Sequence, residues 1–286
     1  MAQEYTFATF DGTELYGKTD AVDDPRAVAV LVHGLCEHQG RYDYLAMRLN
    51  ARGYSVYRFD HRGHGRSAGR RVYYDAFDCI AKDVDAAVDR AAAENPGAPL
   101  FVVGHSMGGY GAALHATMFP GKARGYVLSG AWTRDVKGLC SAAVASDAHD
   151  CEYVDNGLAG GVCSDPAAAR RYWEDPHVEK AVSLGLFRAV HEGHQWLKAH
   201  APQCTSPVAV LHGGADGLVD PRDSIEFFQE IGSEDKSLHI YAGLCHEIFN
   251  EFDKDLVIGD MLAWLDARAS GRGFGPDPFD EAALEA

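Results

Sequence analysis

Short apolar runs alternate along this chain with longer segments in which apolar residues recur every three or four positions. An uninterrupted apolar run is typical of a strand buried on both faces of a parallel sheet, and three-to-four spacing is typical of a helix that covers one. The predicted strands are 27–32, 54–59, 100–103, 126–129, 208–212 and 238–241, and the predicted helices are 42–52, 74–93, 110–119, 222–231 and 252–268. This alternation predicts an α/β fold with a mostly parallel central sheet flanked by helices.

Two regions depart from this alternation. At the start, predicted strands at 4–10 and 14–19 flank Asp11-Gly12, a pair typical of a two-residue hairpin turn. From about 131 to 203 no comparable apolar run occurs, and the composition favours helices. We therefore expect an α/β core at 1–130 and 204–269, a helical cap (lid) inserted at 131–203, and a flexible tail at 270–286, which is rich in Gly, Pro, Asp and Glu.

Composition narrows the classes of function. The 286 residues include 26 Lys and Arg against 42 Asp and Glu, a net charge of −16, which argues against nucleic-acid binding. An apolar content of 47% excludes general disorder. We find no stretch near the roughly 20 apolar residues that span a bilayer, and no secretory signal. The seven cysteines are widely spaced and form no C-x-x-C pair, which favours free thiols and a cytoplasmic protein.

The strongest chemical motif is Gly104-His105-Ser106-Met107-Gly108-Gly109, a G-x-S-x-G directly after a predicted strand and directly before a predicted helix. A serine on such a sharp turn is raised above the sheet, and the glycines make room for the turn. The positive end of the following helix favours the negative charge that develops during acyl transfer. We therefore expect Ser106 to be a nucleophile.

A serine nucleophile needs a base, and the base needs an orienting carboxylate. In proteins with such an elbow the acid and then the base follow the serine, each after a later strand. Asp216 and His246 occupy these positions. Asp220 is a rival acid, but it precedes Pro221 and is typical of a helix N-cap.

Two backbone N–H groups should hold the oxyanion. One belongs to Met107, the residue after the nucleophile, and the other to the loop after strand 27–32, where Leu35 is the best candidate. His33 in the same loop is interpreted as a hydrogen-bonding loop residue rather than a reacting group.

Five ordered blocks now define a resemblance: VHGLCEHQGRY at 32–42, DHRGHGRSAG at 60–69, GHSMGG at 104–109, LHGGADGLVD at 211–220 and CHEIFNE at 245–251. Together they resemble the monoacylglycerol lipases and lysophospholipases of the α/β-hydrolase superfamily, the serine aminopeptidase-like Hydrolase_4 type. The resemblance covers roughly residues 5–268. It implies the α/β-hydrolase fold, a mobile helical cap, no cofactor and no metal.

The resemblance also assigns residues. It implies that Ser106, Asp216 and His246 form the triad and that Leu35 and Met107 supply the oxyanion hole. Glu37 and Arg41 match family residues that help to receive the glycerol end of the substrate. The alternative is that Glu37 and Arg41 form a local ion pair that only shapes their loop.

Two cysteines depart from the family pattern. Cys36 stands where a glycine is common, and Cys245 directly precedes His246. Both are interpreted as small buried apolar residues; the alternative is that they make the enzyme sensitive to thiol reagents. The cluster His149-Asp150-Cys151 lacks a second matched pair of ligands, so a metal site is not expected there.

The cap should choose the substrate. Its apolar residues line an acyl channel or pack the cap on the core: Trp132, Tyr153, Leu158, Tyr172, Trp173, Leu184, Leu186, Phe187 and Trp196. The expected function is a serine hydrolase of a lipid ester, first monoacylglycerol and then lysophospholipid, with possible transient membrane contact through the cap. The alternatives are a short-chain or aryl esterase of the same fold and a catalytically silent binding protein. The sequence makes no prediction of oligomeric state.

Overall fold

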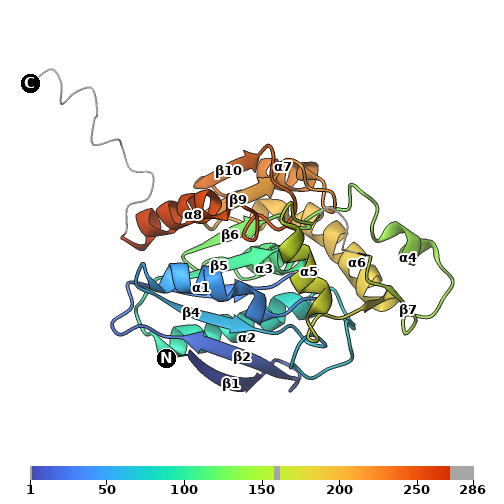
Figure 1. Ribbon diagram of the computed structural model, residues 1–286, viewed down its shortest axis with the longest axis horizontal. Helices are drawn as coiled ribbons and strands as arrows, with labels where there is room; N and C mark the ends of the chain where they lie inside the picture. Colours follow the sequence, from blue (N-terminus) through green and yellow to red (C-terminus); the bar gives the residue numbers. More distant parts are fainter. Residues whose placement is uncertain (1, 158–161, 271–286) are drawn as a thin grey trace, which may run out of the picture.

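The computed structural model describes residues 2–157 and 162–270. Eight strands form one sheet in the order β1-β2-β4-β3-β5-β6-β9-β10 (Figure 1). They are β1 (Ala2–Ala8), β2 (Glu14–Asp20), β3 (Ala27–Val32), β4 (Tyr54–Phe59), β5 (Leu100–His105), β6 (Gly125–Ser129), β9 (Val208–Gly213) and β10 (Lys236–Tyr241). β2 pairs antiparallel with β1 and β4, and all other neighbours are parallel. The predicted α/β fold class is confirmed.

Helices cover both faces of this sheet. The helices of the core are α1 (Asp43–Asn50), α2 (Cys79–Glu94), α3 (Met107–Met118), α7 (Pro221–Glu230) and α8 (Lys254–Ala269), and the 3₁₀ turn η1 (Gln39–Tyr42) precedes α1. Side chains alternate across β3: Val28 and Val30 pack with α2 and α3, whereas Ala29 and Leu31 pack with α1 and α8. An apolar residue at every position of β3 is therefore required by two cores, one on each face.

The predicted cap is the segment between β6 and β9. It consists of α4 (Ser141–Ala145), β7 (Tyr153–Asp155), α5 (Pro166–Glu174), β8 (Ala181–Ser183), α6 (Leu184–His200) and the turn η2 (Ala201–Gln203). The segment predicted to be helical also contains a short two-stranded sheet, because β7 and β8 pair antiparallel. Strands of three residues are too short to leave a periodic pattern. The division into core and cap domains stays a prediction, and the predicted tail lies, apart from Ser270, outside the described residues.

Two local predictions also need correction. The first hairpin closes through a five-residue loop at 9–13, because Ala8 pairs with Glu14. Helix α2 begins at Cys79 rather than at residue 74. The segment before α2 contacts the cap instead, because the Ser183 hydroxyl donates a hydrogen bond to the Val72 carbonyl at 2.6 Å.

The parallel strands bring four loops to one edge of the sheet. The loops after β3, β5, β9 and β10 all leave the carboxyl ends of their strands, and Figure 1 shows the cap elements gathered beside that end. None of the helices in residues 2–157 and 162–270 combines the length and the apolar character needed to cross a bilayer.

Candidate active site

Ser106 lies on a strained turn between β5 and α3. Its backbone has φ 55° and ψ −119°, a rarely populated positive-φ conformation that costs a residue with a side chain about 1–3 kcal/mol. The flanking glycines allow it, because a Cβ at Gly104 would lie 2.4 Å from the Gly108 carbonyl oxygen and one at Gly108 would lie 2.2 Å from that of Val32. Strain of this kind persists where the surrounding structure holds a reactive group in place.

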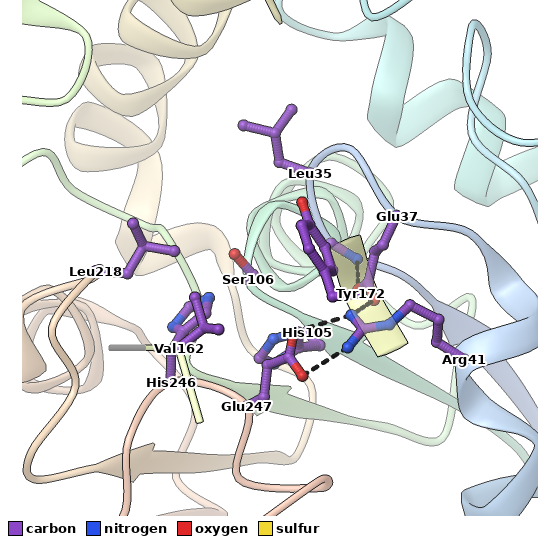
Figure 2. A pocket seen from close by; sticks show the side chains of 11 residues that line it. Leu35, Glu37, Arg41, His105, Ser106, Val162, Tyr172, Leu218, His246 and Glu247 are labelled. Atoms are coloured by element: carbon purple, nitrogen blue, oxygen red, sulfur yellow. Dashed lines mark hydrogen bonds and ion pairs between the residues drawn. The ribbon is translucent and has the colours of Figure 1, made fainter. Parts of the chain in front are cut away.

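His246 and Asp216 are hydrogen-bonded to each other. The His246 Nδ1 donates a hydrogen bond to Asp216 Oδ2 at 2.6 Å, so Nε2 carries the free lone pair and is the basic atom of the ring. Nε2 has no hydrogen-bond partner among the described residues. Ser106 and His246 line the same pocket (Figure 2), although no hydrogen bond joins them in this structure. Such bonds commonly tighten only when substrate is present.

Asp216 is held by three hydrogen-bond donors and lies close to a second imidazole. Its Oδ1 accepts from the backbone N–H groups of Leu218 and Val219 at 2.7 and 2.9 Å. Its Oδ2 lies 3.1 Å from Nε2 of a second imidazole, His212, in addition to His246. Burial alone would raise the pKa of Asp216, but the two imidazoles hold it well below its ordinary value. The carboxylate is therefore ionised and fixed in direction.

The rival acid has a different role. Asp220 accepts a hydrogen bond from the Arg222 backbone N–H at 3.0 Å and is the N-cap of α7, as predicted. The interpretation of His33 is also confirmed. Its Nε2 accepts from the His61 backbone N–H at 2.9 Å, so its proton is on Nδ1, which lies 2.7 Å from the Gly34 carbonyl oxygen.

The two predicted oxyanion donors border the pocket region. Leu35 lines the pocket beside Ser106, and Met107 begins α3. Neither backbone N–H has a hydrogen-bond partner in the described part of the chain. Buried N–H groups without a partner are rare in proteins, and a pair of them beside a nucleophile provides an anion site. Cys36 follows Leu35 with φ 64°, a conformation that favours glycine and explains why glycine suits this position.

Glu37 and Arg41 meet at one end of the pocket. Glu37 Oε1 accepts from the Gly34 N–H and from the Tyr42 hydroxyl, both at 2.6 Å, and its Oε2 pairs with Arg41. Burial would raise the pKa of Glu37, but the Arg41 guanidinium holds it below its ordinary value. Because both its oxygens are occupied, the geometry favours the loop-shaping alternative for Glu37.

Sequence reasoning missed Glu247. Its carboxylate binds Arg41 through two hydrogen bonds of 2.8 and 2.7 Å, so the guanidinium is held between two acids (Figure 2). The block that contains His246 was recognised, but its next residue was given no role. The signal was available, because a glutamate beside the base of a buried site needs a cation. His212 was missed as well, and no local pattern predicted its proximity to Asp216. Tyr172 was expected as a cap residue, but its contact with Arg41 was not.

A second, apolar cavity of about 190 Å³ also borders Ser106. Its lining includes Leu35, Trp132, Leu139, Phe187, Leu218 and Val219. Three of the expected cap residues line a pocket: Trp132 and Phe187 line this cavity, and Tyr172 lines the pocket beside Arg41. The others do not line either pocket: Leu184 and Leu186 are buried, Trp196 is partly buried, and Tyr153 and Trp173 are exposed. Leu158 lies outside the described residues. Ser106 thus borders two pockets, one that includes the charged side chains of Glu37, Arg41 and Glu247 and one with a mainly apolar lining.

The two unusual cysteines are poor nucleophiles here. Burial, with Glu179 nearby, raises the pKa of the Cys36 thiol, and burial together with Glu251 raises that of Cys245. Metal binding is not indicated either. No group of three or more His, Cys, Asp and Glu side chains in the described ranges could hold an ion, and Asp150 pairs with Arg188 instead.

Comparisons with known proteins agree with this geometry. Residues 23–253 match the family described as Hydrolase_4, serine aminopeptidase, S33. A monoacylglycerol lipase from Mycolicibacterium smegmatis is 36% identical over 92% of this chain and 96% of its own length. Human monoglyceride lipase is 30% identical over 89% of this chain and 87% of its own.

Solved structures give the same result. Monoacylglycerol lipase from Paleococcus ferrophilus superposes with a TM-score of 0.79 at 30% identity, covering 89% of this chain and 99% of that one. A soluble variant of the Saccharomyces cerevisiae monoglyceride lipase, in complex with a substrate analogue, gives 0.81 at 26% identity, covering 94% and 95%. The resemblance drawn from the five sequence blocks is confirmed, and the chain belongs to the serine aminopeptidase S33 (Hydrolase_4) family of α/β-hydrolases.

Proposed function

We propose that this protein is a serine hydrolase that releases the fatty acid from a monoacylglycerol. One observation carries the proposal: a buried aspartate fixes the tautomer of His246, whose free Nε2 shares a pocket with a serine on a strained elbow. The relatives named monoacylglycerol or monoglyceride lipase support the choice of substrate.

The reaction follows from this arrangement. His246 Nε2 takes the proton of the Ser106 hydroxyl while Oγ attacks the ester carbonyl carbon. The N–H groups of Leu35 and Met107 stabilise the oxyanion. His246⁺ then gives its proton to the departing glycerol oxygen, and an acyl-enzyme remains. His246 then activates a water molecule that attacks the acyl carbon, so that the fatty acid is released and the free Ser106 hydroxyl is restored.

The two pockets beside Ser106 suit the two parts of the substrate. The acyl chain occupies the apolar cavity, where burial contributes about 0.8 kcal/mol for each CH₂. The glycerol hydroxyls lie in the pocket beside Arg41, whose free volume of about 20 Å³ must widen to admit them, and Glu37 shapes the loop rather than contacting substrate. We expect kcat/KM to rise with acyl length and then to fall when the cavity is full. A flat profile from C2 to C16 would instead favour a general esterase.

The cap also offers apolar side chains to a lipid surface. Val144, Tyr153, Val154 and Trp173 are exposed on it. These residues support transient contact with a bilayer in which the substrate dissolves, and flotation with neutral vesicles tests it. The seven cysteines are all free thiols, which supports a reducing location such as the cytoplasm.

The decisive experiment is release of oleate from 1-monooleoylglycerol, with Ser106→Ala as control. We expect turnover by the wild type and a loss of at least about 10³-fold in the variant, because the nucleophile is removed. Labelling of Ser106 by a fluorophosphonate without lipid turnover would keep the hydrolase and reject the lipase. Failure of the folded protein to label would support a silent binding protein.

A further inference from the structure

We propose that residues 162–179, which comprise α5 and its two flanks, act as a splint that positions both the base and the oxyanion loop. The inference rests on the proposed function and adds a catalytic positioning role for the cap. Each end of the splint is bonded to a different catalytic loop, and its middle contacts the residue that links those loops.

The first end of the splint holds the loop of His246. The Glu247 backbone N–H donates to the Val162 carbonyl at 2.7 Å. The buried Glu251 carboxylate accepts from the backbone N–H groups of Ser164 at 2.9 Å and Cys245 at 3.0 Å. Cys245 and Glu247 are the two neighbours of His246 in the chain. The backbone on both sides of the base is therefore tied to the cap, directly or through one carboxylate.

The second end holds the oxyanion loop. The Glu179 backbone N–H donates to the Cys36 carbonyl at 2.8 Å. His38 Nδ1 accepts from the Gly40 N–H, so its Nε2 carries the proton and donates to Asp175 at 2.9 Å. Cys36 has a positive φ that an L-residue rarely adopts without support. The hydrogen bond from Glu179 supports that conformation, which in turn orients the N–H of Leu35.

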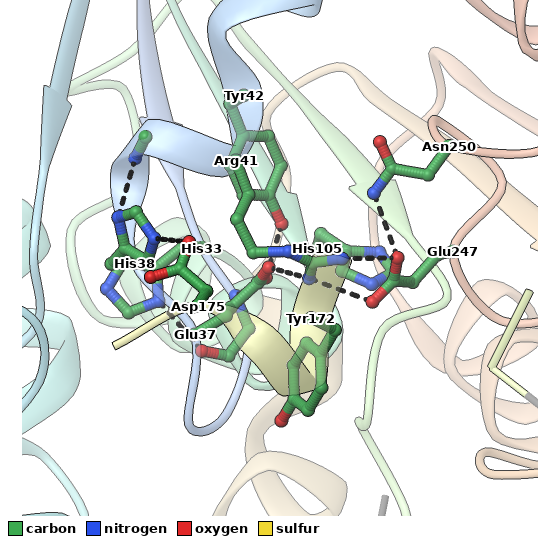
Figure 3. Close-up of polar contacts among 12 residues, drawn as sticks. His33, Glu37, His38, Arg41, Tyr42, His105, Tyr172, Asp175, Glu247 and Asn250 are labelled. Carbon is green, nitrogen blue, oxygen red and sulfur yellow. Dashed lines mark hydrogen bonds and ion pairs between the residues drawn. The ribbon is translucent and has the colours of Figure 1, made fainter. Parts of the chain in front are cut away.

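The middle of the splint contacts the link between the two loops. The Tyr172 ring lies 4.9 Å from the Arg41 guanidinium, which binds Glu37 on one loop and Glu247 on the other (Figure 3). Helix α5 has nine residues and so is about 13 Å long, short enough to act as a rigid spacer. Movement of the splint would shift the base relative to the oxyanion donors.

This role differs from substrate binding in a measurable way. A cap that only shapes the acyl cavity affects long-chain substrates and leaves small soluble esters unchanged. A splint that aligns catalytic groups affects every ester, because small misplacements of those groups are costly. p-Nitrophenyl acetate therefore separates the two roles.

The Ser164 hydroxyl also donates to the Glu251 carboxylate. The test variant is Ser164→Ala combined with Asp175→Ala, which removes this hydroxyl contact at one end and the Asp175–His38 contact at the other and changes no residue of the catalytic loops. Arg170→Ala, an exposed change on the same helix, is the control. We expect kcat for p-nitrophenyl acetate to fall about tenfold in the double variant with KM changed less than twofold, and the control to match the wild type. Each single variant should lose two- to fourfold.

Thermal melting monitored by circular dichroism accompanies the kinetics, and the rates are measured at least 15 °C below the lowest melting temperature. Unchanged kcat for p-nitrophenyl acetate in all three splint variants would overturn the proposal, as would a loss confined to 1-monooleoylglycerol. If the single variants fold and the double variant does not, the single variants decide by the same criterion. Wild-type protein that hydrolyses neither ester would refute the proposed function instead, so the two failures are distinguishable.

Discussion

The sheet and the outer cap, residues 141–155 with α4 and β7, are held together by different means. In β3, β4, β5, β6 and β9 every residue is buried, and the helices on both faces enclose two apolar clusters. The outer cap depends more on polar groups. Arg188 alone donates to the carbonyls of Ala143, Ser146 and Ala148 and pairs with Asp150. Burial of apolar surface stabilises the core, whereas the geometry of a few polar contacts sets the shape of the outer cap.

The largest expected contrast is in stability. Phe101 is fully buried between Tyr54 and Trp264, so Phe101→Ala should cost about 3–5 kcal/mol through lost burial and the cavity left behind. Trp173 is partly exposed on the cap, and Trp173→Ala should stay within about 0.5 kcal/mol. Urea unfolding measures both. Equal losses in the two variants would show that the cap is as tightly packed as the sheet.

This difference also explains what the sequence could predict. The uninterrupted apolar run at Ala27–Val32 and the turn around Ser106 leave local patterns, so the sheet and the elbow were predicted to within a few residues. β7 and β8 have three residues each, and their pairing depends on contacts far apart in the chain.

The same limit applied within the site. Asp216 and His246 each follow a strand, and this position identified them. His212 lies inside a strand and was not singled out, because only the fold shows that its ring turns toward Asp216. Glu247 gains its role from Arg41, which is 206 positions away in the chain. Long-range polar partners of this kind have no sequence period.

A second contrast concerns polar groups inside the core. His212 places Nε2 3.1 Å from Asp216, while its Nδ1 lies 2.7 Å from the Ser224 hydroxyl. His212→Leu removes the imidazole that lies beside the carboxylate orienting His246 and that also contacts the Val219 carbonyl at 3.2 Å, so kcat should fall about tenfold or more with little change in KM. His212→Gln can still donate an N–H and should recover most of the loss. Identical kinetics of the two variants would exclude a positioning role for this contact.

A third prediction concerns pH and the junction of cap and core. His194 on α6 lies 2.6 Å through Nε2 from the Trp132 carbonyl, and burial lowers its pKa from 6.5 to about 3. The folded chain then binds fewer protons than the unfolded chain between these values. The stability that neutral, buried His194 contributes is therefore complete above pH 6.5 and decreases as the pH falls.

The cost from His194 alone should reach about 1 kcal/mol at pH 5.5. His194→Gln keeps a donor for the carbonyl but does not titrate. Urea unfolding at pH 7.5 and 5.5 should therefore show a smaller pH-dependent loss in this variant by about that amount. His105, whose pKa burial lowers to about 4, adds a similar loss in both proteins and cancels in the difference. An unchanged pH dependence would mean that His194 is not buried in solution.

The smallest effect is expected from thiol chemistry. Cys36 is buried, whereas Cys245 is partly exposed, and burial raises the pKa of both thiols, which leaves little thiolate of either at pH 7.5. Cys151 is partly exposed on the cap, far from Ser106 in the chain. Iodoacetamide should therefore label Cys151 first and change kcat less than twofold, with mass spectrometry identifying the site and Cys151→Ser as the matched control. Rapid inactivation that tracks alkylation of Cys36 or Cys245 would show that the oxyanion or histidine loop opens to solvent, and the protection that the cap gives these loops would then be only transient.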